Sequence, residues 1–516
     1  MLARVTTFTI DGVDPRRVWV EVDIRPGLPA FTIVGLGDAA VRESRDRVRA
    51  AILNMSFEFP KTRITANLAP AFLRKVGPGF DVALAVGVLA ASGQIPAEPL
   101  LSAAVFGELS LSGELRDSPG ALAVAEGTAA AGLPRLIVPA SRAREAALVE
   151  GLQVSGAESL HEVATLLRGG EEAEREWARA SWAVSVAVAP SIARPPDRPD
   201  LEDVRGHEGP VLALTVAAAG GHNLLLEGAP GTGKTMLARR MPSILPPLTR
   251  TQAIAVTRIH SVAGIHADGL VAAPPFRAPH HTISAAGLVG GASPPRPGEA
   301  TLAHHGILFL DELSEFSRPS LDALRQPLED GHVTIVRGQR ALVFPSAFML
   351  LAATNPCPCG FAGVGDRCGC GDADLRRHRR RLSGPMLDRM DLLVDVRRPS
   401  NAELRAGSAT DSAAVRTRVL AARERQLARL SGTDARCNGE MDGRQAQQLV
   451  RLSADAERAL GRAYDRGVLS ARGRHRVVRV AQTLADLDGR PAVALGDVLT
   501  ALSLRQRDAS PNEAAA

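Results

Sequence analysis

The spacing of apolar residues divides the chain into three parts with different expected structures. In residues 1–168, segments in which apolar and polar residues alternate are followed by segments with helical spacing. In residues 201–398, continuous apolar runs predict buried strands, and several of these runs end in polar residues. In residues 399–507, Ala, Leu, Arg and Glu recur at helical spacing, which predicts a helical domain.

The first part is expected to form a compact α/β domain. A helix is predicted over 38–55, and a Gly-Pro-Gly turn at 77–79 precedes an apolar helix over 81–92. The expected strands cover residues 18–24, 30–34 and 63–68. This alternation of strand and helix indicates one α/β unit with its own core.

Two segments are predicted to lie outside the folded domains. Residues 169–200 contain an acidic run and then four prolines, which is typical of a linker. Residues 508–516 are expected to form a disordered tail.

One stretch in the second part matches the pattern G-x-x-x-x-G-K-[ST] in full. It comprises Gly228, Ala229, Pro230, Gly231, Thr232, Gly233, Lys234 and Thr235. An apolar run precedes it and a helix-like segment follows, which is the context that a P-loop needs and a chance match lacks. Lys234 can reach the β- and γ-phosphates of ATP, and the Thr235 hydroxyl can hold Mg²⁺.

Two later apolar runs end in residues suited to ATP hydrolysis. Residues 307–310 are followed by Asp311, which can hold Mg²⁺, and by Glu312, which can polarise a water molecule for attack on the γ-phosphate. Another run ends at Asn355, which can orient that water or only cap the strand. Together with the P-loop, these strand ends predict an ATPase.

The composition permits nucleic acid as a partner without requiring it. Hydrophobic residues make up 45% and charged residues 23% of the chain, as in ordinary globular proteins. A net charge of +5 suits either DNA binding or a solvated Arg-rich surface. The longest apolar stretch, residues 82–91, is too short to span a bilayer, and the N-terminal residues lack a signal-peptide pattern. We therefore expect a cytoplasmic protein with no membrane partner.

Four of the five cysteines are clustered as C-x-C-x₈-C-x-C. They are Cys357, Cys359, Cys368 and Cys370. Four thiolates can hold Zn²⁺ in a tetrahedral structural site, which we favour. Reduced free thiols and a redox disulfide are the alternatives, while a secreted disulfide framework does not fit this clustering.

Four further motifs have a form that is specific to one family. They are PFRAPHHTIS at 275–284, PGE at 297–299, LAHHGILFLDEL at 302–313 and NPCPCG at 355–360. These motifs resemble the ComM/YifB family of Mg-chelatase-like AAA+ ATPases, and the resemblance covers nearly the whole chain. It implies a helix-2-insert AAA+ domain, a homo-hexameric ring and an action on branched or single-stranded DNA in recombination or natural transformation. It gives no role to His280 and His281.

The resemblance also implies roles for single residues of the ATPase. Asn355 occupies the sensor-1 position. Arg389 is the arginine-finger candidate, with an ion pair to Asp388 or Asp391 as the alternative. Arg472 is the first choice for sensor 2 and Arg479 the second, and a surface role is the alternative for both.

Residues 333–336 and 341–344 alternate as two strands of a hairpin. This hairpin resembles the pre-sensor-1 hairpin of MCM-type helicases, which projects into the channel of the ring. Arg337 and Arg340 at its turn are therefore predicted to contact DNA phosphates, a contact that carries no sequence information. A solvated basic turn is the alternative.

The N-terminal domain resembles Lon-type protease domains at residues 75–81 and 107–113. Lon peptidases need a serine nucleophile that is activated by a lysine. Gly79 and Leu122 stand at these two positions, so we expect no peptidase activity.

The expected architecture is α/β. A Lon-like N-terminal domain precedes a parallel-sheet AAA+ domain with a helix-2 insert and a pre-sensor-1 hairpin, and a C-terminal helical lid follows. The favoured function is that of an ATP-driven motor on DNA. The alternatives are a magnesium-chelatase-like ATPase that remodels a partner protein and, less favoured, the regulatory ATPase of a protease.

Overall fold

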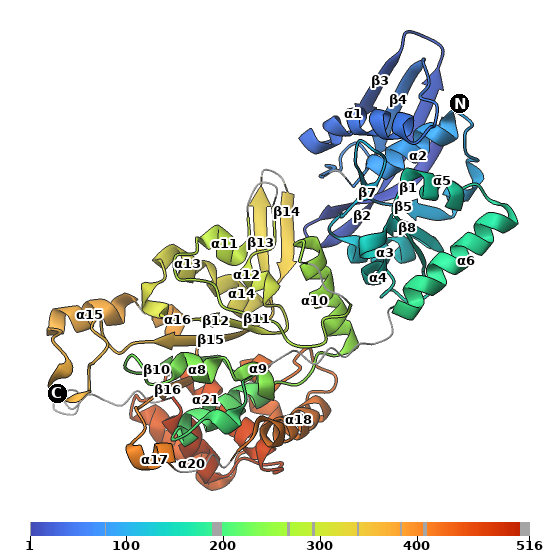
Figure 1. Ribbon diagram of the computed structural model, residues 1–516. Helices are drawn as coiled ribbons and strands as arrows, with labels where there is room; N and C mark the ends of the chain where they lie inside the picture. Colours follow the sequence, from blue (N-terminus) through green and yellow to red (C-terminus); the bar gives the residue numbers. More distant parts are fainter. Residues whose placement is uncertain are drawn as a thin grey trace.

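The computed structural model describes residues 2–77, 79–187, 199–265, 269–291, 295–337, 340–381, 384–405 and 410–505. Figure 1 shows an N-terminal domain in blue and teal, a central domain mostly in green and yellow, and a helical domain in orange and red.

The N-terminal domain is built on a seven-stranded mixed sheet with the strand order β3-β4-β2-β1-β5-β8-β9. These strands are β1 (Leu2–Asp11), β2 (Asp14–Arg25), β3 (Ala30–Val34), β4 (Arg63–Ala69), β5 (Ala103–Val105), β8 (Arg135–Pro139) and β9 (Gln153–Ala157). Its principal helices are α1 (Ala39–Asn54), α2 (Asp81–Ala91), α3 (Ala121–Ala130), α4 (Ala143–Ala146) and α5 (Leu160–Leu166). Helix α2 is buried along its whole length, as its uniformly apolar sequence requires, and it packs against β1 and β2.

The first half of the predicted linker is instead a helix, α6 (Gly170–Ala187), which packs along β9. Its Trp177 is only 3% exposed and donates its indole N–H to the Leu166 carbonyl. The acidic run that suggested a linker contributes to the solvated face, where Glu171 pairs with Arg175. The composition of this segment indicated the charged face of α6. It did not reveal that the helix also has a buried face. Residues 188–198 of the predicted linker lie outside the described residues.

The central domain contains a five-stranded parallel sheet with the order β11-β12-β15-β10-β16. The strands are β10 (Leu224–Glu227), β11 (Phe276–Arg277), β12 (Ile307–Leu310), β15 (Met349–Thr354) and β16 (Leu392–Asp395). The three apolar runs predicted as buried strands are β10, β12 and β15, which lie side by side in the middle of the sheet. In the register of these strands, Leu226 and Leu310 pair with Ala353 and Ala352 of β15, so all three strands end at one edge.

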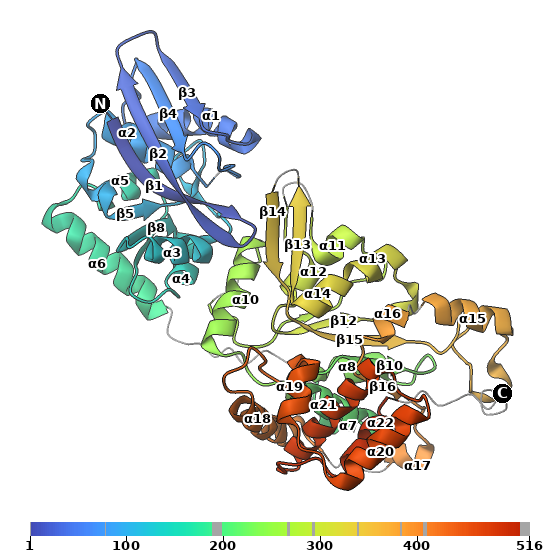
Figure 2. The ribbon, with the colours of Figure 1, turned by 180° about the vertical axis from the view of Figure 1, so that it is seen from behind.

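The described helices of this domain are α7 (Glu208–Gly220), α8 (Lys234–Ala238), α9 (Met241–Ile244), α10 (Arg250–Val262), α11 (Ala285–Val289), α12 (Glu299–Leu302), α13 (Arg318–Ala323), α14 (Arg325–Asp330), α15 (Asp372–Arg381) and α16 (Gly384–Leu387). A separate antiparallel hairpin joins β13 (His332–Arg337) to β14 (Arg340–Pro345). Both views show it projecting from the central domain beside the ends of β1 and β2 (Figures 1 and 2).

The helical domain comprises α17 (Asn401–Arg405), α18 (Ser412–Arg429), α19 (Gly443–Leu449), α20 (Ala454–Asp465), α21 (Ala471–Leu487) and α22 (Leu495–Ser503). Helices α18 and α21 pack on α7, and their buried residues share one core with strands β10 and β16. The domain therefore lies below the sheet as an integral part of the ATPase fold (Figure 2). The predicted tail, residues 508–516, lies outside the described residues.

Candidate functional site

The P-loop joins β10 to α8, and its lysine points back into the loop. Gly231 and Gly233 have φ angles of +77° and +92°, a left-handed conformation that favours glycine. The Lys234 ammonium donates to the carbonyls of Gly228 (2.6 Å) and Ala229 (2.9 Å). Burial lowers the pKa of Lys234, and the charge of Asp311 opposes this effect. The cation is therefore held inside a loop whose backbone can surround a polyphosphate.

The two residues predicted to hold Mg²⁺ are in direct contact. The Thr235 hydroxyl donates to Oδ2 of Asp311 over 2.8 Å, although the residues lie 76 positions apart in the chain. Hydroxyl and carboxylate oxygens are ligands that Mg²⁺ prefers beside ATP phosphates. The donor set at this point of the sheet therefore fits the ion.

Asn355 lies at the same edge of the sheet as the P-loop and Asp311. It follows β15, and its Oδ1 accepts a hydrogen bond from the Lys234 ammonium over 3.1 Å. Its own carbonyl accepts from Nε2 of His378 on α15, over 2.9 Å, which fixes the backbone behind the side chain. The structure thus brings together the P-loop, Asp311 and Asn355, which sequence analysis placed on separate strands.

Glu312 has an unusual backbone for a glutamate. Its φ and ψ are 52° and 49°, the left-handed region that residues other than glycine rarely adopt. Its N–H donates to Oδ1 of Asp311, and its side chain is 56% exposed. Nδ1 of His281 lies 3.4 Å from its Oε2. Sequence analysis gave this histidine no role, and no spacing rule links the two positions.

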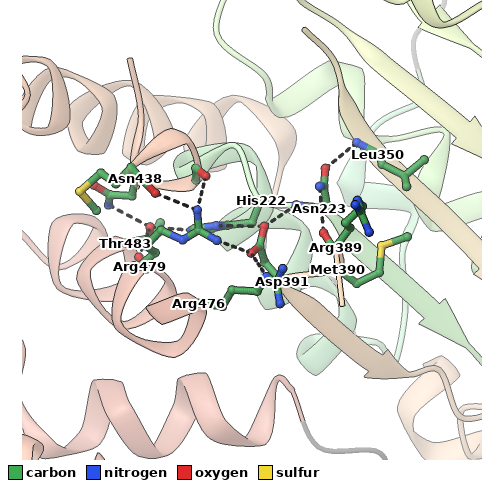
Figure 3. A network of polar contacts seen from close by, with 12 residues as sticks. His222, Asn223, Leu350, Arg389, Met390, Asp391, Asn438, Arg476, Arg479 and Thr483 are labelled. Carbon is green, nitrogen blue, oxygen red and sulfur yellow. Dashed lines mark hydrogen bonds and ion pairs between the residues drawn. The ribbon is translucent and has the colours of Figure 1, made fainter. Parts of the chain in front are cut away.

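Arg389 lies just before β16, at the end of the sheet opposite to the P-loop. Its guanidinium pairs with Glu329. Its carbonyl accepts a hydrogen bond from the Asn223 side chain (Figure 3). The observed partner, Glu329, is neither of the two ion-pair partners that were considered from the sequence, Asp388 and Asp391. Because Arg389 is remote from the P-loop of its own chain, contact with nucleotide would require a neighbouring subunit.

Asp391 anchors the helical domain to the sheet (Figure 3). Its carboxylate contacts Arg479 (3.1 Å) and Arg476 (3.5 Å) of α21, and it accepts a hydrogen bond from the Asn223 N–H. Burial opposes ionisation, but Arg479 and the contact with His222 outweigh it and hold the pKa of Asp391 well below its usual range. Sequence analysis missed this network because its members come from distant segments.

The structure does not bring the sensor-2 candidates to the P-loop of the same chain. Arg479 is engaged by Asp391 and by the carbonyls of Gly439 and Met441. Arg472 is exposed at the start of α21. The adjoining Gly473 lies beside Arg505, which binds the carbonyls of Met390 and Asp391 at the start of β16. The helix therefore begins at the same end of the sheet as Arg389, and the assignment of sensor 2 stays a prediction.

The four clustered cysteines converge in the loop that follows Asn355. Their Sγ atoms all lie within 4.8 Å of one another. The separations of Cys357 from Cys359 and Cys368 are 3.3 and 3.8 Å, and Cys359 lies 3.6 Å from Cys368. These distances are too long for a disulfide, which spans about 2.05 Å. Four thiolates at about 2.3 Å from one Zn²⁺ would lie about 3.8 Å apart, so the donor set fits that ion.

The loop that carries the cysteines rests on the P-loop. A Cβ atom at Gly360 would lie 2.6 Å from Cδ of Pro230, so only glycine permits this close approach. A metal held by the cysteines would therefore brace both the P-loop and Asn355.

The hairpin is fixed at its base and extends outward. Val333 and Phe344 are buried with Ile259 of α10 and with Val13, which lies in the turn between β1 and β2. Farther out, Val336 is 68% exposed. The side chains of Arg337 and Arg340 lie outside the described part of the chain, so their proposed DNA contacts stay predictions.

The Lon-like positions have no room for a catalytic dyad. A Cβ atom at Gly79 would lie 2.4 Å from the Phe106 ring. Leu122 is fully buried on α3, and its N–H donates to Glu145. A serine and a lysine at these two positions would collide with, or be enclosed by, the packed core.

The parallel sheet, the P-loop, and Asp311 and Asn355 at neighbouring strand ends define a P-loop ATPase of the AAA+ type. Known families agree with this class. Residues 200–404 match "Magnesium chelatase, subunit ChlI", residues 20–142 match "Subunit ChlI of Mg-chelatase", and residues 409–505 match "Magnesium chelatase, subunit ChlI C-terminal". The chain belongs to the ComM/YifB family of Mg-chelatase-like AAA+ ATPases.

Relatives match over almost the whole chain. Competence protein ComM of Haemophilus influenzae is 39% identical over 96% of this chain and 95% of its own. YifB of Escherichia coli is 40% identical over 98% and 97% of the two chains. An uncharacterized protein of Mycobacterium tuberculosis is 42% identical over 98% and 99%.

One comparison and one property of the helices bear on the other predictions. Lon protease 2 of Bacillus subtilis is 31% identical over 142 residues, a weak similarity that covers 26% of this chain. Among the described residues, every helix is too short or too polar to cross a membrane.

Proposed function

We propose that this protein is an ATP-hydrolysing ring motor that acts on DNA, in branch migration or strand separation. The proposal rests on two features of the central domain. The P-loop, Asp311 and Asn355 lie together at one edge of its sheet, and a hairpin with a basic turn projects from the same domain. The hairpin base is packed against α10 and the N-terminal domain, so a displacement of the hairpin would be transmitted to both. Membership in the family that includes ComM, a competence protein, supports the same function.

The residues of the site divide the hydrolysis reaction among them. Lys234, Thr235 and Asp311 would hold ATP and Mg²⁺, and the bound ion would supply positive charge against the charge that develops on the γ-phosphate. Glu312 accepts a proton from the attacking water, and Asn355 orients that water. Arg389 would complete the site of the next subunit, because it lies at the far end of the sheet from its own P-loop. This division of labour requires a neighbouring subunit, and we propose that the subunits form a homo-hexameric ring.

The test is ATP hydrolysis by the purified protein, alone and with single-stranded, duplex or branched DNA, at two salt concentrations. Stimulation by DNA that weakens as salt rises supports a motor that grips phosphates. Hydrolysis that responds to no DNA would favour a magnesium-chelatase-like ATPase that remodels a partner protein. The role of regulatory ATPase for a protease is the least supported, since positions 79 and 122 cannot form a peptidase dyad.

We also propose that the four clustered cysteines hold a structural Zn²⁺. The convergence of their Sγ atoms and the contact of Gly360 with Pro230 support this proposal. Metal analysis should find one zinc per chain, and the double variant Cys359→Ser/Cys368→Ser should lose it. The matched control is Cys437→Ser, because Cys437 lies in the helical domain, away from the cluster. Zinc-free protein with normal hydrolysis would contradict the proposal.

A further inference from the structure

An open cleft lies between the N-terminal domain and the hairpin. Its volume is about 520 Å³, which is within the range of sites that hold a small organic group such as a nucleotide base. The hairpin contributes Ala341 to its lining. The N-terminal domain contributes residues from the end of β1, the start of β2 and the turn after β4, which are Asp11, Arg16, Arg17, Pro70, Phe72 and Leu73. The cleft is therefore separate from the ATPase edge of the sheet.

Strand pairing and domain packing explain why these segments meet. Strand β4 is antiparallel to β2, and its last residue, Ala69, lies opposite Trp19. The residues after β4 therefore run past the start of β2. Val13, in the turn between β1 and β2, shares a buried cluster with Phe344 of the hairpin, and Figure 2 shows the hairpin beside this end of the sheet. The walls of the cleft are thus fixed by the fold.

The two arginines of the cleft are not neutralised by a carboxylate. Arg16 is exposed and Arg17 is half-buried. Arg17 donates to the Thr6 hydroxyl over 3.4 Å, and its Cζ lies 5.1 Å from the centroid of the Trp19 ring. Within the described part of the chain, neither guanidinium forms an ion pair, and Nε of Arg17 has no acceptor. Asp11 is the one carboxylate among the described lining residues, so positive charge is in excess, and phosphate oxygens would supply the missing acceptors.

An aromatic ring is exposed in the same cleft. The side chain of Phe72 is 76% exposed, whereas that of the adjoining Leu73 is only 9% exposed. A single exposed apolar residue is ordinary, but this ring shares its cleft with two guanidinium groups. Aromatic rings stack on unpaired bases of any sequence, and arginines bind the phosphates that join them. The combination fits a single strand of nucleic acid, because the bases of a duplex are already stacked on one another.

We propose that this cleft binds single-stranded DNA, with Phe72 as a stacking platform for a base and with Arg16 and Arg17 as phosphate contacts. Ala341 lies opposite Val336, one position from the pair that closes the hairpin. A DNA strand that contacts the hairpin turn can therefore continue directly into the cleft. The inference rests on the proposed DNA motor, and it assigns part of the path of the DNA strand to the N-terminal domain.

The first test measures binding of a labelled oligothymidylate by fluorescence anisotropy. Loss of one stacked base in Phe72→Ala should raise the Kd by about 5- to 100-fold. Phe72→Leu, which keeps an apolar side chain but no ring, should bind as weakly as Phe72→Ala, and Phe72→Trp should restore affinity. An abasic oligonucleotide of the same length keeps the phosphates without the bases, so its Kd should be the same for Phe72→Ala and the unchanged protein. Equal affinity of these two proteins for oligothymidylate would overturn the proposal.

The second test concerns the arginines. Arg16→Ala/Arg17→Ala should weaken binding of the intact and the abasic oligonucleotide alike. It should also reduce the slope of log K against log salt by about 1.4, since each phosphate contact on a single strand contributes about 0.7. Arg16→Ala alone, at an exposed position, should give about half of this change. Arg175→Ala/Arg179→Ala removes two exposed arginines from α6 of the same domain and is the matched control. An unaltered slope in both cleft variants would exclude the phosphate contacts.

The outcomes separate this inference from the proposed function. If the unchanged protein neither binds single-stranded DNA nor hydrolyses ATP faster with DNA, the motor and the cleft both fail as proposals. If the unchanged protein responds to DNA and the cleft variants respond equally, only the cleft fails. Light scattering should give the same assembly mass for the unchanged protein and the cleft variants. A smaller mass in the variants would identify the cleft as a contact between subunits and overturn its assignment to DNA.

Discussion

At the scale of single residues, the site depends on one cation enclosed by backbone carbonyls. Lys234 is only 8% exposed, and it contacts the P-loop and Asn355 at once. Under the proposed function, a group placed in this way is expected to bind nucleotide and to align the strand ends. Glu312 differs because its side chain is exposed, and the proposed mechanism gives it a role in the chemical step rather than in binding.

Lys234→Ala should weaken ATP binding. A charge-assisted hydrogen bond contributes about 1.5–3 kcal/mol, so the Kd should rise by about 10- to 100-fold. Titration with a fluorescent ATP analogue measures this change. Lys61→Ala, which removes an exposed lysine of the N-terminal domain, is the control and should bind normally. Unchanged tight binding by Lys234→Ala would refute the P-loop interpretation.

Glu312→Gln should bind ATP normally and hydrolyse it very slowly. Loss of the group that accepts the proton from water is expected to lower kcat by about 10²- to 10⁴-fold. Single-turnover hydrolysis with bound ATP separates this effect from binding. Glu315→Gln, three positions along the chain and also exposed, is the matched control. Ordinary turnover by Glu312→Gln would mean that another residue activates the water.

At the scale of elements, the hairpin and the helical domain place their side chains in opposite ways. The hairpin buries Val333 and Phe344 at its base and exposes Val336 farther out. Helix α21 instead directs Arg476 and Arg479 inward, onto a buried carboxylate. The first arrangement suits contact with a partner, and the second suits a fixed interface.

Arg337→Ala tests whether the hairpin contacts DNA. Removal of one phosphate contact should lower DNA affinity and reduce the slope of log K against log salt by about one unit. Fluorescence anisotropy with labelled single-stranded DNA at several salt concentrations gives that slope. Arg318→Ala removes an exposed arginine on α13 of the same domain and should leave the slope unchanged. An unaltered slope in Arg337→Ala would remove this residue from the interface.

Asp391→Asn should destabilise the junction between α21 and the sheet. Loss of a buried ionic partner leaves two arginines without their counter-charge, and we expect a cost of about 3 kcal/mol at neutral pH. Calorimetry should show a lower Tm. Asp455→Asn, which alters an exposed pair with Arg458, should change stability by less than about 0.5 kcal/mol.

The same carboxylate makes the stability of this junction depend on pH. The folded pKa of Asp391 lies below its ordinary value of about 3.9. Its contribution is therefore complete above about pH 5 and is lost as the pH falls through the unfolded pKa toward the folded pKa. The difference in Tm between the unchanged protein and Asp391→Asn should stay constant from pH 7 to about pH 5 and shrink in stronger acid. A difference that grows on acidification would contradict this sign.

At the scale of the whole molecule, the P-loop and the arginine-finger candidate lie at opposite ends of the central sheet. The P-loop, Asp311 and Asn355 lie at the carboxyl ends of the strands, whereas Arg389 precedes β16. One subunit therefore carries an ATP site at one end and the arginine-finger candidate at the other. A ring lets each subunit complete the site of its neighbour.

Mixing two inactive variants tests this arrangement. Arg389→Ala should bind ATP but hydrolyse it at least about 10³-fold more slowly. Lys234→Ala should also be inactive, yet it keeps Arg389. If the arginine acts between subunits, rings assembled from both variants should regain part of the hydrolysis rate, measured after mixing at equal concentrations. No recovery in verified mixed rings would indicate that Arg389 acts only within its own chain.

The sequence by itself determined the local parts of this protein. The P-loop, the buried strands that Asp311 and Asn355 directly follow, and the family to which the chain belongs can all be recognised from short contiguous patterns. Such patterns are informative because a phosphate-binding loop and a buried strand are each made by neighbouring residues.

Only the tertiary structure decided the contacts between distant residues. It showed that α6 has a buried face, that Arg389 pairs with Glu329, that the four thiols converge and that His281 faces Glu312. These contacts depend on strand register and on packing between elements. The spacing of residues along the sequence does not encode either property. It indicates which residues belong to the same helix or strand, but not which helices and strands pack against each other.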